Sequence, residues 1–361
     1  MTAETHRILG YDFASGLAII GMIFVNFKTL MVVETDAYLY QLVDLLSGKA
    51  AALFVVLAGV GMTLMYRKAK AKNDVGEIRK VKIILLKRAA FLFVVGLSYY
   101  AIWPADILHY YGLHVTIGVL FLSVSRKWLL TISFLLIIAY SVSMLFFNYD
   151  AVWNWNTLEY TDFFNVNRFF RNFFLNGSHP VCPWISFLLT GIWIGRINFN
   201  ETKIRKRLTL FSLTLFIVFK SISIFLIGTL NQLSPTEASN ITYLLRTTPI
   251  PPSFFYMITA CSSAVFIISI SMYISTKLSH TLFIKQMVST GQLSLSNYFL
   301  HVIIGMLAIK LFFRKLEFAF SIEFTLVYAI FFSIVIIFFS HIWRMKFKHG
   351  PLEYIMRKIA G

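Results

Sequence analysis

Residues 321–342 read SIEFTLVYAIFFSIVIIFFSHI, and Glu323 is the only Asp, Glu, Lys or Arg among them. An α-helix needs about 20 mostly apolar residues to cross the hydrocarbon core of a bilayer. Similar stretches recur along the chain, near 11–33, 46–66, 84–103, 105–125, 128–147, 180–197, 208–229, 253–275 and 290–312. The sequence therefore predicts an all-α integral membrane protein with about ten transmembrane helices, forming a single polytopic membrane domain over residues 1–361.

The composition points the same way. Of the 361 residues, 58% are hydrophobic and only 14% are charged, and the mean hydropathy is +0.73. Soluble domains carry about a quarter charged residues, so most of this surface does not face water. The formal net charge of +17 lies mainly between the apolar runs. Membrane topology explains that charge, and we expect no nucleic-acid partner.

Lys and Arg gather in alternate loops. The segments 67–83 and 198–207 and the tail 343–361 hold most of the loop Lys and Arg, and the intervening loops hold few. Because cytoplasmic loops are enriched in these residues, the pattern predicts both termini inside (N-in/C-in), with 343–361 as a cytoplasmic tail. An even number of spans is then required, which ten satisfies.

The terminal and loop segments add further expectations. Residues 1–10 lack the basic region of a cleavable signal peptide, so we interpret the first apolar run as a signal anchor. Residues 148–179 mix aromatic side chains with Asn, Asp and Arg, and they predict an outer amphipathic loop with helices lying at the interface. The two cysteines, Cys182 and Cys261, fall on different predicted helices and indicate neither a CxxC site nor a disulfide framework.

The strongest acid–base pattern is WPADILHYYGLH, residues 103–114. Asp106 and His109 are three residues apart and share a helix face. A carboxylate that orients an imidazole is the arrangement a general base needs, although a purely structural hydrogen-bonded pair would look the same. His114, five residues beyond His109, is expected to point elsewhere. His179, in NGSHPVCPW (176–184), lies at the predicted outer mouth of the sixth span, where a structural role is also open.

Other polar residues interrupt apolar runs, where ionisable groups are costly and usually paired or functional. Asp12 and Asn26 lie roughly 21 Å apart near one face of the first span, either lining a pathway or packing against other helices. Lys49 opens the second span and is expected to snorkel to the outer interface. In the ninth span Ser294, Asn297 and His301 form a polar stripe.

Motifs of soluble enzymes are absent from the sequence. It contains no P-loop, HExxH, GxSxG or zinc-ligand spacing. We therefore expect no metal.

Four segments together resemble a known family. DFASGLAIIGMIFVN (12–26) is similar to the first-span signature of the heparan-α-glucosaminide N-acetyltransferase family and its bacterial YeiB-type relatives. GKAAALFVVLAGVG (48–61), HPVCPWISFLLTGIWIGR (179–196) and GPLEYIMR (350–357, preceded by Trp343) resemble segments of the bacterial relatives in the same order. The resemblance spans nearly the whole chain.

The resemblance implies a transmembrane acyltransferase that takes an acyl group, usually acetyl, from cytoplasmic acyl-CoA and delivers it to a sugar or glycan beyond the membrane. We expect a bacterial inner-membrane enzyme embedded in lipid, and a homodimer and a monomer are both open. The assignments are catalytic His109, Asp106 and His179; substrate-binding Asn26, Lys49, Asn297 and His301; and acyl-CoA-binding Asp12, Arg88 and Arg196.

Two positions depart from the family pattern. Ser15 stands where the family has Arg before Gly16, and residues 27–48 contain no His, although the lysosomal enzyme carries one there. If that His carries the chemistry, His109 or His179 would have to replace it. A small-solute transporter and a non-enzymatic membrane partner are the alternative interpretations. Uptake of a labelled solute without CoA dependence would favour the transporter. An unchanged phenotype in a variant with Ala at His109, His179 and His301 would favour the non-enzymatic partner.

Overall fold

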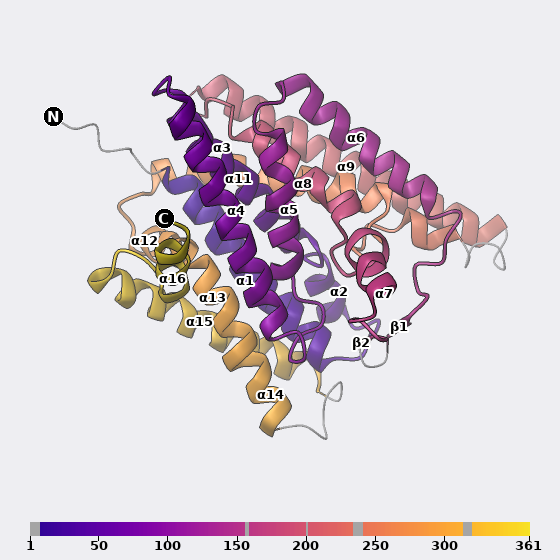
Figure 1. Cartoon of the computed structure of the whole chain (residues 1–361). Helices are drawn as coiled ribbons and strands as arrows, with labels where there is room; N and C mark the ends of the chain where they lie inside the picture. Colours follow the sequence, from indigo (N-terminus) through magenta and orange to yellow (C-terminus); the bar gives the residue numbers. More distant parts are fainter. Residues whose placement is uncertain (1–7, 156–158, 200, 234–240, 313–319) are drawn as a thin grey trace. The chain divides into compact units, whose positions relative to one another are not determined.

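The computed structural model describes residues 8–155, 159–199, 201–233, 241–312 and 320–361. It is helical almost throughout, with one two-stranded sheet in the described part of the chain, and it confirms an all-α membrane protein (Figure 1). Within these ranges, seven helical stretches are long and apolar enough to cross a membrane: Leu9–Met31, Tyr38–Lys70, Arg126–Ser143, Thr202–Leu233, Phe254–Lys277, Ser294–Phe312 and Ile322–Lys346. Ten spans and the N-in/C-in orientation stay predictions.

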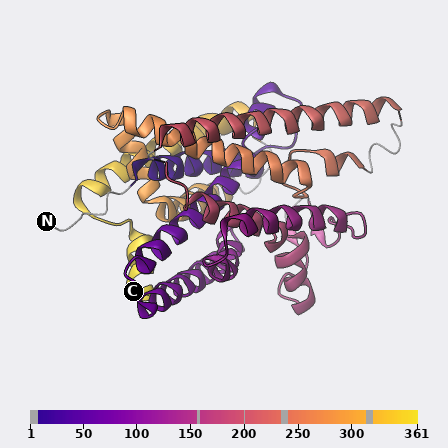
Figure 2. The ribbon, with the colours of Figure 1, turned by 90° about the horizontal axis from the view of Figure 1, so that it is seen from above.

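These stretches correspond to named elements. They are α1 (Leu9–Met31), α2 (Tyr38–Asp44) with α3 (Lys49–Lys70), α6 (Arg126–Ser143), α9 (Thr202–Leu233), α11 (Phe254–Lys277), α13 (Ser294–Leu300) with the π-helix η2 (His301–Met306) and α14 (Leu307–Phe312), and α15 (Ile322–Lys346). Helix α9 is a single unbroken helix of 32 residues, the long red ribbon of Figure 2.

Three predicted spans differ from their helices. The 84–103 stretch belongs to α4 (Val75–Ser98), whose first turns are charged and whose N-terminus is capped by Asp74. The 105–125 and 180–197 stretches contain α5 (Leu108–Phe121) and α8 (Val181–Ile194), each of only 14 residues. A 14-residue helix is about 21 Å long, shorter than a hydrocarbon core of about 30 Å.

The helices fall into two compact units. The first comprises 1–50, 199–210 and 265–355. In it α1 packs against α12 (Leu282–Gln292), α13 and α15. A Cβ at Gly291 would lie 1.8 Å from the Asp12 carbonyl oxygen, so only glycine permits this approach of the α1 and α12 backbones. Phe13, Ile284 and Met287 fill the core beside this contact.

The second unit comprises 51–198, 211–264 and 356–361. Here α5 packs against both α4 and α8, and α6 covers α8. Helices α3 and α8 meet through small residues, since a Cβ at Gly191 would lie 1.9 Å from the Val56 carbonyl oxygen. Close backbone contact of this kind is typical of helices packed within a membrane.

The 148–179 segment is only partly helical. It contains the antiparallel pair β1 (Trp153–Asn154) and β2 (Glu159–Tyr160), the short helix α7 (Val166–Arg171) and the π-helix η1 (Asn172–Asn176). Buried Asn176 holds the segment together: its Nδ2 donates to the carbonyls of Tyr149 (2.9 Å) and Ala151 (3.0 Å), and its Oδ1 accepts from the Tyr160 hydroxyl (2.8 Å). Of the helices expected in this segment, the described residues form only α7 and η1.

Candidate functional site

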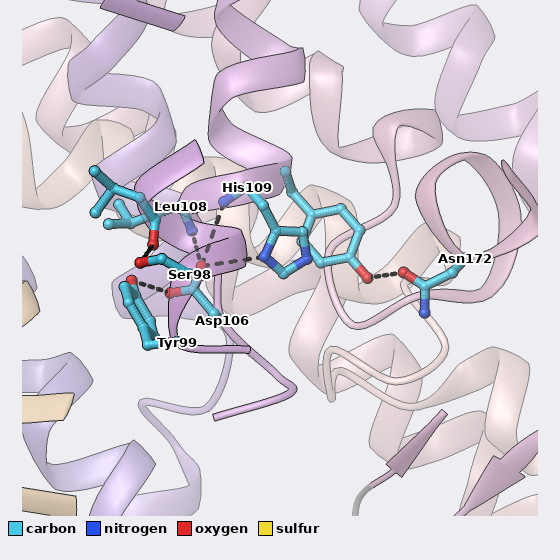
Figure 3. Close-up of polar contacts among 8 residues, drawn as sticks. Ser98, Tyr99, Asp106, Leu108, His109 and Asn172 are labelled. Atoms are coloured by element: carbon cyan, nitrogen blue, oxygen red, sulfur yellow. Dashed lines mark hydrogen bonds and ion pairs between the residues drawn. The ribbon is translucent and has the colours of Figure 1, made fainter. Parts of the chain in front are cut away.

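The site in the second unit is built around the start of α5. Asp106 Oδ2 accepts from the backbone N–H of Leu108 at 2.7 Å and of His109 at 3.3 Å, so the carboxylate caps this helix end. The same oxygen lies 3.2 Å from His109 Nδ1. The Tyr99 hydroxyl donates to the other oxygen, Oδ1, at 2.7 Å (Figure 3). The predicted Asp106–His109 contact is therefore present.

This contact fixes the tautomer of His109. Asp106 Oδ2 accepts from two backbone N–H groups and therefore also accepts from His109 Nδ1, which carries the hydrogen, so Nε2 keeps its lone pair. Nε2 is buried and has no hydrogen-bond partner among the residues described. His109 thus presents an unused proton acceptor in a site from which water is excluded.

Aromatic rings enclose the imidazole. His109 is 0% exposed, and its ring centroid lies 4.2 Å from Tyr110, 5.5 Å from Phe173 and 6.0 Å from Tyr100. Phe173 comes from η1, so the 148–179 segment supplies part of the wall. The Tyr110 hydroxyl bonds to Asn172 Oδ1, which ties α5 to η1 (Figure 3).

His179 lies in the same region. Its ring centroid is 5.8 Å from Tyr110 and 4.5 Å from Trp184, and its buried Nδ1 has no hydrogen-bond partner in the described structure. Loss of solvation lowers the pKa of His179 well below 6.5, and nearby His114 and His109 lower it further. His179 is therefore neutral at pH 7 and could accept a proton.

Two members of this region, Trp184 and Tyr99, were not singled out from the sequence, and His114 was placed only relative to His109. His114 was expected to point away, but it is fully buried and close enough to His179 to influence its charge. Trp184 was read only as part of a motif, and Tyr99 carried no signal because it precedes the predicted turn. The sequence signal that could have found them is the presence of polar residues next to the starts of two short helices, α5 and α8.

The substrate-binding candidates lie in the first unit. Asn26 Nδ2 and His301 Nε2 are 2.9 Å apart, and His301 Nδ1 contacts the Tyr298 carbonyl. Both ring nitrogens of His301 are thus engaged, and the π-helix η2 begins at this residue. Asn297 Nδ2 donates to Thr290 O (3.0 Å) and Ser340 Oγ (2.8 Å), which is a helix-packing role.

Lys49 does not snorkel to an exposed interface as expected, because it is only 9% exposed. It lies near Asp44, whose carboxylate bonds Lys28 Nζ at 2.5 Å and the Ser47 hydroxyl at 2.7 Å. Lys28 is buried, and its Nζ lies 4.1 Å from the centroid of the Tyr40 ring. Sequence reasoning missed this ion pair, although a Lys inside an apolar run was a signal.

The three acyl-CoA candidates have different surroundings. Asp12 Oδ2 accepts from Gln292 Nε2 at 3.0 Å, within the first unit. Arg196 donates to the carbonyls of Val124 and Leu122, just after α5. Its positive charge stabilises the C-terminal end of this helix, where the helix dipole is negative. Arg88 contacts the Met65 sulfur at 3.4 Å, and its Nε has no partner among the described residues. Of the two arginines, only Arg88 keeps an unused buried donor.

No group of three or more His, Cys, Asp and Glu side chains in the described ranges is arranged to hold a metal ion.

Comparisons with known proteins give the family. A family model described as heparan-alpha-glucosaminide N-acetyltransferase, catalytic, matches residues 7–230, and one described as a protein of unknown function (DUF418) matches residues 196–361. No curated protein matches the chain. The first match confirms the resemblance seen in the sequence and covers more than half of the 361 residues. The chain is a multi-pass membrane protein that belongs to the heparan-alpha-glucosaminide N-acetyltransferase family of transmembrane acetyltransferases.

Proposed function

We propose that this protein transfers an acetyl group from cytoplasmic acetyl-CoA to an amine or hydroxyl of a glycan beyond the membrane, in a bacterial inner membrane. The observation that carries the proposal is the buried His109, oriented by Asp106 and left with a free Nε2 lone pair. Family membership supplies the reaction class. It does not identify the acceptor, and for this the family's printed name suggests a glucosaminide amine.

The chemistry follows from the dyad. His109 Nε2 accepts the proton of the acceptor amine or hydroxyl as its nitrogen or oxygen attacks the thioester carbonyl. The carbon–sulfur bond breaks, and the departing CoA sulfur takes up the proton from His109. Asp106 stabilises the imidazolium formed between these steps. A positioned general base of this kind contributes about 10²–10⁴-fold to the rate.

The donor's anionic groups need cations. Arg88, with an unused buried Nε, is the best candidate for the phosphates of acetyl-CoA. Arg196 is engaged with helix carbonyls, so its role is structural in this proposal. Asn26, paired with His301 within the first unit, stays a predicted substrate-binding residue.

The first test is binding of acetyl-CoA to the purified protein by calorimetry, with CoA and ATP as comparisons. The second is acetyl transfer to glucosamine by wild type, His109→Gln and the exposed-site control His280→Gln. We expect saturable binding that Arg88→Gln weakens, and transfer that only His109→Gln abolishes. Absence of any acyl-CoA binding by folded protein would overturn the proposal in favour of a transporter or a non-enzymatic partner.

A further inference from the structure

Trp184, on α8, has a buried indole N–H that makes no hydrogen bond to the described residues. The side chain is 0% exposed, and its indole Nε1 has no hydrogen-bond partner among the described residues. An indole N–H can only donate, and buried tryptophans usually find a partner for it. Leaving such a donor unpaired costs about 1–3 kcal/mol, which a Phe at the same position would avoid.

The surroundings of this donor indicate what it serves. Trp184 stands almost perpendicular to His179, with ring centroids 4.5 Å apart and an interplanar angle of 77°. Beyond His179 lie Tyr110 (5.8 Å) and then His109 (4.2 Å from Tyr110). Three buried nitrogens in this row have no hydrogen-bond partner among the described residues: Nε2 of His109, Nδ1 of His179 and Nε1 of Trp184. Two of them have complementary chemistry, since Nε2 of His109 accepts a hydrogen and Nε1 of Trp184 donates one.

A ligand that satisfies both atoms must offer a hydrogen to the imidazole and an oxygen lone pair to the indole. An acceptor amine or hydroxyl attacking an acyl carbonyl offers both. We propose that the Trp184 Nε1–H donates a hydrogen bond to the carbonyl oxygen of the transferred acyl group and stabilises the negative charge that develops there during attack. This inference rests on the proposed acyl transfer and adds a catalytic residue to it.

If Trp184 donates to the acyl carbonyl, replacing it with Phe should lower activity without lowering stability. Removing one donor to a developing oxyanion typically costs about 10²–10³ in rate. Trp184→Phe keeps a buried ring and removes an unpaired N–H, so we expect acetyl transfer to fall about 100-fold. The KM for acetyl-CoA should change less than about threefold, and the melting temperature should stay equal or rise. Trp128→Phe, at a 61% exposed position, is the control and should change nothing.

A second readout does not need turnover. The chain has seven tryptophans, so the indole ¹⁵N–¹H signals can be assigned from single Trp→Phe variants, and Trp184 by elimination if its own variant does not fold. We expect saturating acetyl-CoA to shift the Trp184 signal downfield, and CoA alone to shift it much less.

The outcomes separate the two proposals. An indole shift without acetyl transfer to any acceptor would support the acyl site and overturn the transferase function. Normal transfer by Trp184→Phe, or no indole shift in an active wild type, would overturn the role of Trp184 alone. Neither transfer nor shift would overturn both.

Discussion

At the scale of single residues, Asp106 does two things with one oxygen: it caps α5 and orients His109. Asp106→Asn separates this geometry from the negative charge. Asn is as good an N-cap as Asp, so the helix should persist with the amide oxygen in the same place, but a neutral amide does not stabilise the imidazolium formed during transfer as a carboxylate does. We expect acetyl transfer to fall about 10²–10⁴-fold with an unchanged melting temperature. Asp162→Asn, whose side chain is 67% exposed, should be neutral; equal activity of the two variants would contradict the assignment.

Gly96 controls how closely α4 approaches this dyad. A Cβ there would lie 2.4 Å from the His109 backbone nitrogen and 2.8 Å from Asp106 Oδ2. Gly96→Ala should therefore displace the start of α5, destabilise the protein by about 1–3 kcal/mol and reduce acetyl transfer. The matched control is Gly228→Ala in α9, where nothing lies within 4 Å and alanine should favour the helix. Thermal unfolding in detergent compares the two, and similar melting temperatures would be the contrary result.

The residue-level predictions from sequence succeeded where partners were local. Asp106 and His109 are three residues apart, so helix periodicity was enough to pair them. The partner of Asn26 lies 275 residues away, and no periodicity relates such positions. The direction of His114 was taken relative to His109 alone, whereas His179 lies near both.

At the scale of elements, the tail helix α16 (Pro351–Ala360) supplies a cap for α13. Glu353 Oε1 accepts from the backbone N–H of Leu295 (2.9 Å) and Ser296 (3.2 Å), and Oε2 contacts the Ser296 hydroxyl. Burial nevertheless raises the pKa of Glu353 above 4.5, and the hydrogen bonds only partly offset it. The folded state therefore favours the protonated carboxyl.

The sign of the resulting pH dependence is definite. Because the folded pKa is the higher one, this contribution to stability is complete below pH 4.5 and is lost as the pH rises through the folded pKa. We expect the melting temperature of Glu353→Gln to lack that decline, since Gln does not titrate. The exposed Glu323→Gln variant should retain it. A slope identical in Glu353→Gln and wild type would refute the expectation.

The 148–179 segment depends on one side chain, that of Asn176, for several of its hydrogen bonds. Asn176→Ala removes the three side-chain hydrogen bonds to Tyr149, Ala151 and Tyr160, each contributing about 0.5–1.5 kcal/mol net. We expect faster backbone hydrogen exchange in this segment and weaker shielding of His109, whereas exposed Asn167→Ala should have no effect. Unchanged exchange in the Asn176 variant would show that aromatic packing alone holds the segment. Sequence patterning could not foresee this network because its acceptors are loop carbonyls, which have no sequence signature.

At the scale of the whole molecule, composition was sufficient for the class of fold but not for the number of crossings. Apolar length alone could not distinguish a crossing from a buried half-length helix, and α5 and α8 are both 14 residues long. Helices α4 and α5 are consecutive, so if both cross, or neither does, the following loop stays on the same side. In either case the parity depends on α8, most of whose residues are buried.

The positive tail argues that α8, with its flanking residues, does cross. With ten crossings, positions 73, 279 and 348 all lie inside and 154 outside; if only the seven long stretches cross, 279 and 348 lie outside with 154. Single cysteines placed at these four positions, in a Cys182→Ala, Cys261→Ala background, can be labelled in intact cells with an impermeant maleimide. We expect labelling at 154 alone, because Arg344 and Lys346, which all four variants retain, favour the predicted cytoplasmic position of the tail. Labelling at 279 and 348 would instead make α8 a re-entrant helix, and its start at His179 and Trp184 would then lie in a cavity lined by protein rather than at a membrane surface.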